Sequence, residues 1–388
     1  MILAVASCLS LAVSASAAST ARKATDFRDY DRTAWYAEAV SAAVDNGLLY
    51  GKSATVIDPN GDMTRAEMAA IINRSFGCYV KADISKYKDV SKDKWYFEDV
   101  AMAVQMGTYN GRSNTAMAPD APITRQEAMA VVARALELDY DSYSKTDLSA
   151  FSDRSEISNW ALPYVRAMVG ADYIHGRGKI LAPQDNITRA EFAQIFYNII
   201  GTYIVSKGTY DKDIKGSVLI RTDEVTLKDM TVDGDLIIGC GAADGKITLD
   251  NVTVTGRLLV WGGGTKAVYC NNGTQMPEVV VARVDDAVKV IYDRDSTLAV
   301  IDTIKVRVTE RAKQHKETEV IFYDVSVLRE AQKQLNAIVA DNQIDITAPA
   351  HLYALVGEQS VKAEFTNNSK SDTYNLEIRR NKDNALIA

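Results

Sequence analysis

One unit occurs three times in the first half of this 388-residue chain. Each copy has a tryptophan, a glycine sixteen residues later with a basic residue directly after it, and then a Thr-Arg-x-Glu sequence that begins five residues after a proline. The tryptophans are Trp35, Trp95 and Trp160, the glycine-basic pairs are Gly51-Lys52, Gly111-Arg112 and Gly176-Arg177, and the last sequences begin at Thr64, Thr124 and Thr188. Matched offsets of this kind indicate three copies of one structural unit.

Each copy is predicted to fold as a helix, a loop and a second helix. From Trp35 to Asn46 apolar residues recur at helical spacing, and Gly47 is a natural left-handed stop. Gly107 fills that place in the second copy, whereas the third has Asp172, which tolerates left-handed backbone less well. The Thr-Arg-x-Glu sequence is a capping box that starts the second helix. A unit of about 50 residues buries little apolar surface alone, so the three copies should pack together.

The three units resemble S-layer homology (SLH) domains, the tandem modules that hold exported proteins on cell walls of the Gram-positive type. Small departures occur at Gln126, where alanine is usual, at Ala161, where the other copies have tyrosine, and at Asp172. The resemblance implies a pseudo-threefold helical assembly that binds an anionic secondary cell-wall polysaccharide, often one ending in a pyruvylated amino sugar. The three predicted repeats are residues 27–78, 87–139 and 151–201.

Three residue types form the predicted polysaccharide-binding site. The arginine of the box is the first residue of a helix, where a guanidinium beside free helix amides suits a carboxylate. The basic residue after the loop glycine closes the other side, and the tryptophan offers a flat face to a sugar ring. The predicted site residues are Trp35, Lys52, Arg65, Trp95, Arg112, Arg125, Trp160, Arg177 and Arg189.

Each of these residues also has a purely structural interpretation. The tryptophans can be core residues, the arginines can pair with a neighbouring aspartate, and the basic loop residues can be solvated charges. Asp29, Asp89 and Asp153, upstream of the tryptophans, are interpreted as caps or turn-formers. The run from Asp58 to Asp62 lacks the glycine and glutamate of an EF-hand loop, so we interpret it as a polar turn.

The extreme N-terminus has the features of an export signal. Residues 1–18 contain an apolar stretch followed by the small residues Ala15-Ser16-Ala17, which predicts a cleaved signal peptide. A lipoprotein-type acylation at Cys8 is the alternative. Removal of the leader leaves Cys78, Cys240 and Cys270, and a disulfide between the last two stays open.

The pattern changes to strands after Gly201. Leu227, Asp229, Val232, Gly234 and Leu236 are matched 22 residues later by Leu249, Asn251, Val254, Gly256 and Leu258. Short strands at this spacing predict a parallel β-solenoid over residues 209–305, with a β-sandwich as the alternative. The predicted fold class is therefore multidomain: helix-rich threefold repeats followed by an all-β region.

The last segment, residues 306–388, is mixed. It has a strand-like run at 320–323, an expected helix near 328–338, and alternating segments at 360–365 and 374–378. These last segments indicate strands of a partial immunoglobulin-like unit, since about 45 residues are too few for a complete one.

Composition narrows the classes of function. A net charge of −7, from 44 basic and 51 acidic residues, argues against a nucleic-acid-binding protein. Three histidines and four cysteines without a metal-binding spacing predict no metal and no cofactor. Beyond the leader no apolar run reaches 18 residues, so we expect no membrane span in the mature chain.

The export signal predicts a secreted protein, and the resemblance to SLH domains implies that it is held non-covalently on the cell wall by a polysaccharide or peptidoglycan-linked polymer. Its second half is a structural or adhesive unit, with self-association in a surface layer left open. No catalytic residue is predicted. The alternative is a wall-anchored β-helical polysaccharide lyase or glycosidase. Its candidate residues would be either Asp229, Asp233, Asp235 and Asp250, or Asp285 and Asp286 with Arg283.

Overall fold

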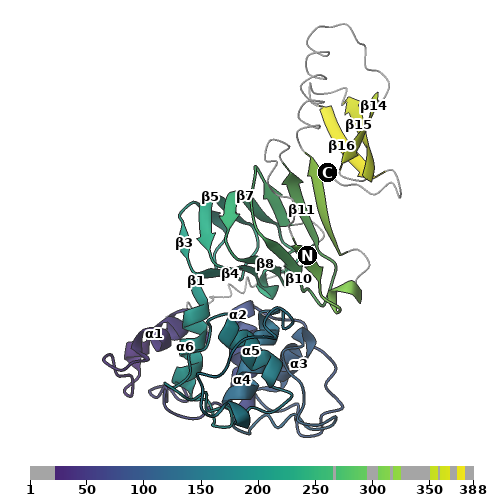
Figure 1. Cartoon of the computed structure of the whole chain (residues 1–388). Helices are drawn as coiled ribbons and strands as arrows, with labels where there is room; N and C mark the ends of the chain where they lie inside the picture. Colours follow the sequence, from purple (N-terminus) through teal and green to yellow (C-terminus); the bar gives the residue numbers. More distant parts are fainter. Residues whose placement is uncertain are drawn as a thin grey trace, which may run out of the picture.

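A computed structural model describes residues 22–264, 268–294, 305–314, 318–324, 350–356, 359–367 and 374–380. The predicted signal peptide, with Cys8, and the predicted helix near 328–338 lie outside these residues. A helical N-terminal module (residues 22–199) is followed by a β-solenoid and then by a small separate sheet (Figure 1).

Each repeat contributes two helices to the N-terminal module, as the sequence predicts. The first helices are α1 (Ala37–Asp45), α3 (Phe97–Met106) and α5 (Leu162–Gly170), and the second helices are α2 (Arg65–Phe76), α4 (Arg125–Ala135) and α6 (Arg189–Ile199). Left-handed residues follow the first helices: Gly47, Gly107 and Asp172 have φ of 67°, 74° and 62°. Asp172 thus adopts the conformation of the glycine that it replaces.

Capping boxes begin all three second helices. The Thr64 hydroxyl accepts a hydrogen bond from the Glu67 amide, and the Glu67 carboxylate accepts one from the Thr64 amide, both at 3.2 Å. The same reciprocal pair forms at the starts of α4 and α6. Each box satisfies two helix amides that would otherwise have no partner within the helix. The local sequence therefore fixes where these helices begin.

Three backbone hydrogen bonds close the repeats into a ring. Met63 N donates to Ile187 O, Ile187 N to Ile123 O, and Ile123 N to Met63 O, each at 3.0 Å. All three side chains are fully buried. The helices follow the same cyclic order, since α2 packs on α3, α4 on α5 and α6 on α1. Each repeat therefore covers its neighbour, and the predicted pseudo-threefold assembly is confirmed.

A parallel β-solenoid continues directly from α6, which confirms the solenoid and excludes the sandwich. One sheet has the order β1-β4-β6-β8-β10-β12 and the other β13-β11-β9-β7-β5-β2, with β3 also paired to β5. The first sheet consists of β1 (Ile200–Ile204), β4 (Ser217–Ile220), β6 (Leu236–Ile238), β8 (Arg257–Val260), β10 (Glu278–Val281) and β12 (Lys305–Val308). The second consists of β2 (Gly208–Tyr210), β3 (Ile214–Lys215), β5 (Val225–Asp233), β7 (Ile247–Val254), β9 (Val268–Asn271), β11 (Lys289–Arg294) and β13 (Glu319–Asp324).

The 22-residue repeat is the step from one coil of the solenoid to the next. Leu227 on β5 pairs with Leu249 on β7 in parallel register. Asp229 and Asn251 share a left-handed backbone, with φ of 50° and 55°, and the Asn251 amide donates to the Asp229 carboxylate at 2.8 Å. The solenoid strands run beyond the predicted range 209–305 at both ends. The predicted strand at 320–323 lies within β13.

One face of the solenoid packs on the N-terminal module. Leu219, Ile237 and Leu259, from adjacent strands of the first sheet, belong to the same buried apolar cluster as the helices. Trp261 is 1% exposed, and its indole N–H donates to Ala135 O at the end of α4 at 3.0 Å. This face of the first sheet therefore shares one core with the helical module, while the inside of the solenoid forms a second apolar cluster.

Solenoid arginines bind the carbonyl ends of the helices. Arg221 donates to Asn46 O after α1 (3.0 Å) and to Arg74 O near the end of α2 (2.8 Å). Arg257 donates to Glu137 O beyond α4 at 3.1 Å. The last carbonyls of a helix lack partners within it and carry partial negative charge, so a cation there is favourable. These contacts orient the solenoid on the ring.

Three later strands form an antiparallel sheet of their own. They are β14 (Ala350–Val356), β15 (Gln359–Asn367) and β16 (Tyr374–Arg380), paired in chain order. The predicted strands at 360–365 and 374–378 lie in β15 and β16, while the immunoglobulin-like unit stays a prediction. Within the described ranges, no helix has the length and apolar character that crossing a membrane requires.

Candidate functional site

Three grooves open where one repeat meets the next. Their volumes are about 360, 440 and 350 Å³, which is the size of a small-ligand site. We number each groove after the repeat that supplies its loop glycine. Groove 1 contains Lys52, Glu67, Trp95 and Arg189; groove 2 contains Arg65, Arg112, Glu127 and Trp160; groove 3 contains Trp35, Arg125, Arg177 and Glu191.

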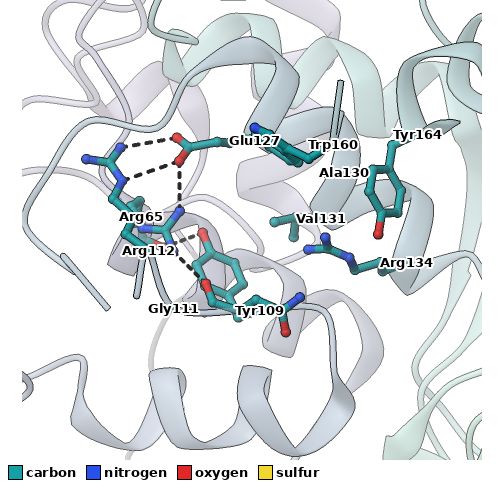
Figure 2. A pocket seen from close by; sticks show the side chains of 11 residues that line it. Arg65, Tyr109, Gly111, Arg112, Glu127, Ala130, Val131, Arg134, Trp160 and Tyr164 are labelled. Carbon is teal, nitrogen blue, oxygen red and sulfur yellow. Dashed lines mark hydrogen bonds and ion pairs between the residues drawn. The ribbon is translucent and has the colours of Figure 1, made fainter. Parts of the chain in front are cut away.

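Every groove takes its walls from all three repeats. In groove 2, Arg112 and Glu127 come from the second repeat, Arg65 from the first and Trp160 from the third (Figure 2). The other two grooves follow by cyclic rotation. All nine predicted site residues therefore line a groove, but the three that meet in one groove belong to three different repeats.

The box arginines are buried at the boundaries between repeats. Arg125 is 5% exposed, and its Nε donates to Leu181 O at 2.8 Å while its Nη1 lies 3.0 Å from the Glu191 carboxylate. Arg65 and Arg189 are buried in the same way and reach the box glutamates Glu127 and Glu67. The partner is thus the capping glutamate of the next repeat, not an aspartate. Each guanidinium lines a groove and also joins two repeats.

A second cation reaches each capping glutamate from the loop. Arg177 Nε lies 2.7 Å from Glu191, Arg112 bonds Glu127 in the same way, and Lys52 pairs with Glu67. Burial alone would raise the pKa of Glu191. The hydrogen bonds from Arg177 and the Thr188 amide, with the charges of Arg125 and Arg177, hold that pKa below its ordinary value. In grooves 1 and 2 one carboxylate therefore faces two cations, whereas in groove 3 Arg177 also pairs with Asp185 at 2.9 Å.

The tryptophans lie on the surface, not in the core. Trp35, Trp95 and Trp160 are 62%, 59% and 49% exposed, so their interpretation as core residues is wrong. The core position belongs to the next residue, because Tyr36 and Tyr96 are almost fully buried. In Figure 2, Trp160 lies across groove 2 from Arg65 and Arg112. A large exposed ring beside a charged groove is typical of a binding surface.

A comparison with known families identifies the repeats. The family described as "S-layer homology domain" matches residues 26–69, 86–129 and 150–193. Each match ends shortly after a capping box and includes one groove glycine and one exposed tryptophan. The chain contains three S-layer homology domains.

Relatives of the chain include surface-layer proteins and enzymes. The surface-layer 125 kDa protein of Lysinibacillus sphaericus is 34% identical over 194 residues, which cover 49% of this chain and 16% of that protein. The S-layer protein sap of Bacillus anthracis is 23% identical over 52% of this chain and 24% of its own length. The amylopullulanase of Thermoanaerobacterium thermosulfurigenes is 29% identical over 44% of this chain and 10% of its own length.

The matched segments thus span no more than about a quarter of these three relatives. The S-layer homology domains, together with the surface-layer relatives, indicate a secreted protein that is associated with the cell wall at the cell surface.

The first two S-layer homology domains add an arginine that the sequence analysis did not single out. The Arg74 guanidinium lies 4.0 Å from the ring centroid of Tyr50 in groove 1, and that of Arg134 lies 4.5 Å from Tyr164 in groove 2. Both stand nine residues after the box arginine, where the third domain has Asn198. Comparing the repeats at this offset would have found them. Grooves 1 and 2 thus hold three cations against one carboxylate. Groove 3 holds the two arginines Arg125 and Arg177, and Arg177 pairs with Asp185 as well as with Glu191.

The aspartate upstream of each tryptophan fixes a loop of its own S-layer homology domain. Asp153 accepts hydrogen bonds from the amides of Leu181 and Ala182 at 2.9 and 2.7 Å, and Asp29 and Asp89 do the same in their domains. Arg125 binds the carbonyl of the same Leu181. The aspartate and the arginine therefore hold one loop between them, and the turn-forming interpretation is confirmed.

The solenoid aspartates named as catalytic candidates take part in structural contacts. Asp235 pairs with Arg257 at 2.6 Å, and Asp285 pairs with Arg283 at 3.0 Å. Asp229 accepts from Asn251, Asp233 from Thr255, Asp250 from Asn272, and Asp286 from the Ala287 amide. The contacts of Asp229, Asp233, Asp235 and Asp250 join neighbouring coils, 22 residues apart in the chain, and those of Asp285 and Asp286 are local, as is common for aspartate at turns.

Proposed function

We propose that the three S-layer homology domains attach the protein non-covalently to the cell wall by binding an anionic secondary polysaccharide in their grooves. One observation carries this proposal: an exposed tryptophan and at least two cations line the same groove, and the arrangement is repeated three times. The tryptophan face suits a sugar ring, and the cations suit a carboxylate such as that of a pyruvylated sugar.

The chemistry of the groove favours a charged sugar over a neutral one. In groove 2, Arg65, Arg112 and Arg134 accompany the single carboxylate of Glu127, and a ligand carboxylate would fill this anion deficit. Three grooves on one rigid ring also suit a polymer, because successive sugars of one chain or of neighbouring chains can bind more than one groove. Multivalent binding of this kind raises the overall affinity well above that of one groove.

For the second half we propose a displayed structural or adhesive role without catalysis. S-layer homology domains occur in surface-layer proteins and also in proteins named as glycan-degrading enzymes, so the domains do not decide this question. The structural contacts of the solenoid aspartates favour the non-catalytic role. The alternative, a polysaccharide lyase or glycosidase, predicts glycan turnover that is lost when one of these aspartates is replaced by asparagine.

The loop cations provide a test of the binding mode. We expect Lys52→Gln, Arg112→Gln and Arg177→Gln together to weaken binding of the full chain to cell-wall sacculi at least about tenfold at low salt, since each groove loses about 1 kcal/mol or more of attraction. Binding of this variant should also depend less steeply on salt concentration than binding of the wild type, because fewer charged contacts remain to be screened. Sedimentation isotherms at several salt concentrations measure both effects.

A matched variant controls for total charge. Lys86, Lys92 and Lys145 are exposed lysines of the same module that do not line the grooves. Changing these three to glutamine alters the net charge equally, and we expect wall binding to stay near the wild-type level. An equal loss in both variants would show that attraction is spread over the whole surface, against the proposal.

A further inference from the structure

The end of the first S-layer homology domain touches the solenoid backbone to backbone. Helix α2 ends at Phe76, and Gly77 follows with φ of 68°. A Cβ atom added to Gly77 would lie 2.8 Å from Gly241 Cα, and one added to Gly239 would lie 2.6 Å from Phe76 O. Contacts this close admit only glycine at these positions. The glycines therefore allow the backbones of the two segments to lie in direct contact.

Each of these segments carries a cysteine at the point of contact. Cys78 Sγ lies 3.3 Å from Cys240 Sγ, although the residues are 162 positions apart in the chain. Met106 Sδ, at the end of α3, lies 3.5 Å from Cys78 Sγ. Both cysteines are half-buried. The remaining described cysteine, Cys270, is buried in the separate apolar cluster inside the solenoid. Cys240 thus contacts Cys78, and its disulfide with Cys270 stays an open prediction.

We propose that Cys78 and Cys240 form a disulfide in the exported protein, which covalently fastens the wall-binding ring to the solenoid. Disulfides form and persist outside the cytoplasm, where this protein is located. The two sulfurs already lie in contact, and neighbouring segments need to shift by little more than an ångström to reach bonding distance. Two of the three described cysteines would then be bonded where the helical module meets the solenoid.

The oxidation proceeds by exchange with a small disulfide such as oxidised glutathione. The Cys240 thiolate attacks one sulfur of glutathione disulfide and releases one glutathione thiolate. The Cys78 thiolate then attacks the Cys240 sulfur of the mixed disulfide and releases the second. Two protein thiols lose two electrons and two protons, and one glutathione disulfide is reduced to two glutathione molecules. Because thiolates react and thiols do not, mildly alkaline pH accelerates the reaction.

The bond would reinforce contacts that already join the two parts. Arg221 binds the ends of α1 and α2 next to the cysteines, and Trp261 packs its ring against Phe76. A disulfide prevents these contacts from separating, so force or flow acting on the displayed solenoid is transmitted to the wall through a closed joint. We expect the oxidised protein to unfold at a higher temperature than the reduced one.

Peptide mapping of the full chain tests the proposal. The protein is incubated with oxidised glutathione, denatured, alkylated and digested with trypsin. We expect residues 75–81 joined to residues 229–246 in a species two hydrogen atoms lighter than the two peptides together, and its loss on reduction. Cys270→Ser should retain the linked species and Cys78→Ser should lose it. Oxidation should raise the unfolding midpoint of the wild type and of Cys270→Ser, and a reductant should reverse this rise. Cys78→Ser should show no such rise.

Three results would overturn the proposal. One is complete alkylation of Cys78 and Cys240 after oxidation. Another is a link from residues 229–246 to residues 267–283, which would restore the pairing of Cys240 with Cys270. The last is stoichiometric Cu(I) binding that requires Cys78 and Cys240 and persists in the presence of oxidised glutathione, which would make the three sulfurs a soft-metal site.

Discussion

Replacing Trp35, Trp95 and Trp160 together by alanine is expected to abolish measurable binding of the full chain to cell-wall sacculi. Tryptophans that fill a binding site commonly contribute about 2 kcal/mol each, which is roughly a thirtyfold loss of affinity per groove. Because all three grooves lose their apolar wall, multivalent binding cannot compensate. Sedimentation with sacculi over a range of protein concentrations measures the loss.

The stability of this triple variant should not change, so a loss of wall binding cannot be attributed to a folding defect. The three side chains are between 49% and 62% exposed, and surface substitutions usually alter the free energy of unfolding by less than about 0.5 kcal/mol. Replacement by phenylalanine keeps a flat ring in each groove and should retain most of the binding. Tyr79→Ala, which removes an exposed aromatic ring outside the three grooves, should bind walls normally. Full wall binding by the triple alanine variant would show that the ligand does not use this wall of the groove.

Arg125→Ala is expected to destabilise the N-terminal module by roughly 3 kcal/mol. Removing one partner of a buried ion pair costs about 3–5 kcal/mol, and we take the lower figure because Glu191 keeps Arg177 as a partner. The Leu181 carbonyl also loses the donor that joins the second repeat to the third. Chemical denaturation followed by tryptophan fluorescence measures the change, since three of the four tryptophans lie in this module.

Arg32→Ala is the matched control, because Arg32 is an exposed arginine of the same module. It should leave the unfolding midpoint within experimental scatter of wild type. An Arg125→Ala protein as stable as wild type would contradict the structural role of the box arginine. A loss of wall affinity in Arg125→Ala would reflect both the changed groove and the destabilised fold. Substitution of the exposed tryptophans tests the groove alone.

The sequence was sufficient for the parts that depend on local contacts. Capping boxes satisfy neighbouring amides, so the starts of α2, α4 and α6 follow from four residues each. The left-handed stop after α1 and the 22-residue step of the solenoid are likewise local patterns. The residue types of the grooves could also be predicted, because each repeat carries one tryptophan, one basic residue after the loop glycine and one box arginine.

The sequence could not show how residues from different repeats combine. Spacing within one repeat does not reveal that Arg65 reaches the loop of the second repeat, or that Trp160 of the third closes the same groove. Such contacts follow from the ring through Met63, Ile123 and Ile187, which is tertiary structure. The contact between the helical module and the solenoid could not be predicted for the same reason. Arg221 binds carbonyl groups at helix ends that lie 147 and 175 residues away in the chain.

The central claim is that the S-layer homology domains bind the secondary polysaccharide of the wall and not the wall in general. Sedimentation of the full chain with native sacculi, and with sacculi from which that polysaccharide has been removed, tests it most directly. We expect the protein to pellet with native sacculi, to stay in solution with stripped ones, and to be released from native sacculi by soluble polysaccharide. Equal pelleting with native and stripped sacculi would contradict the claim.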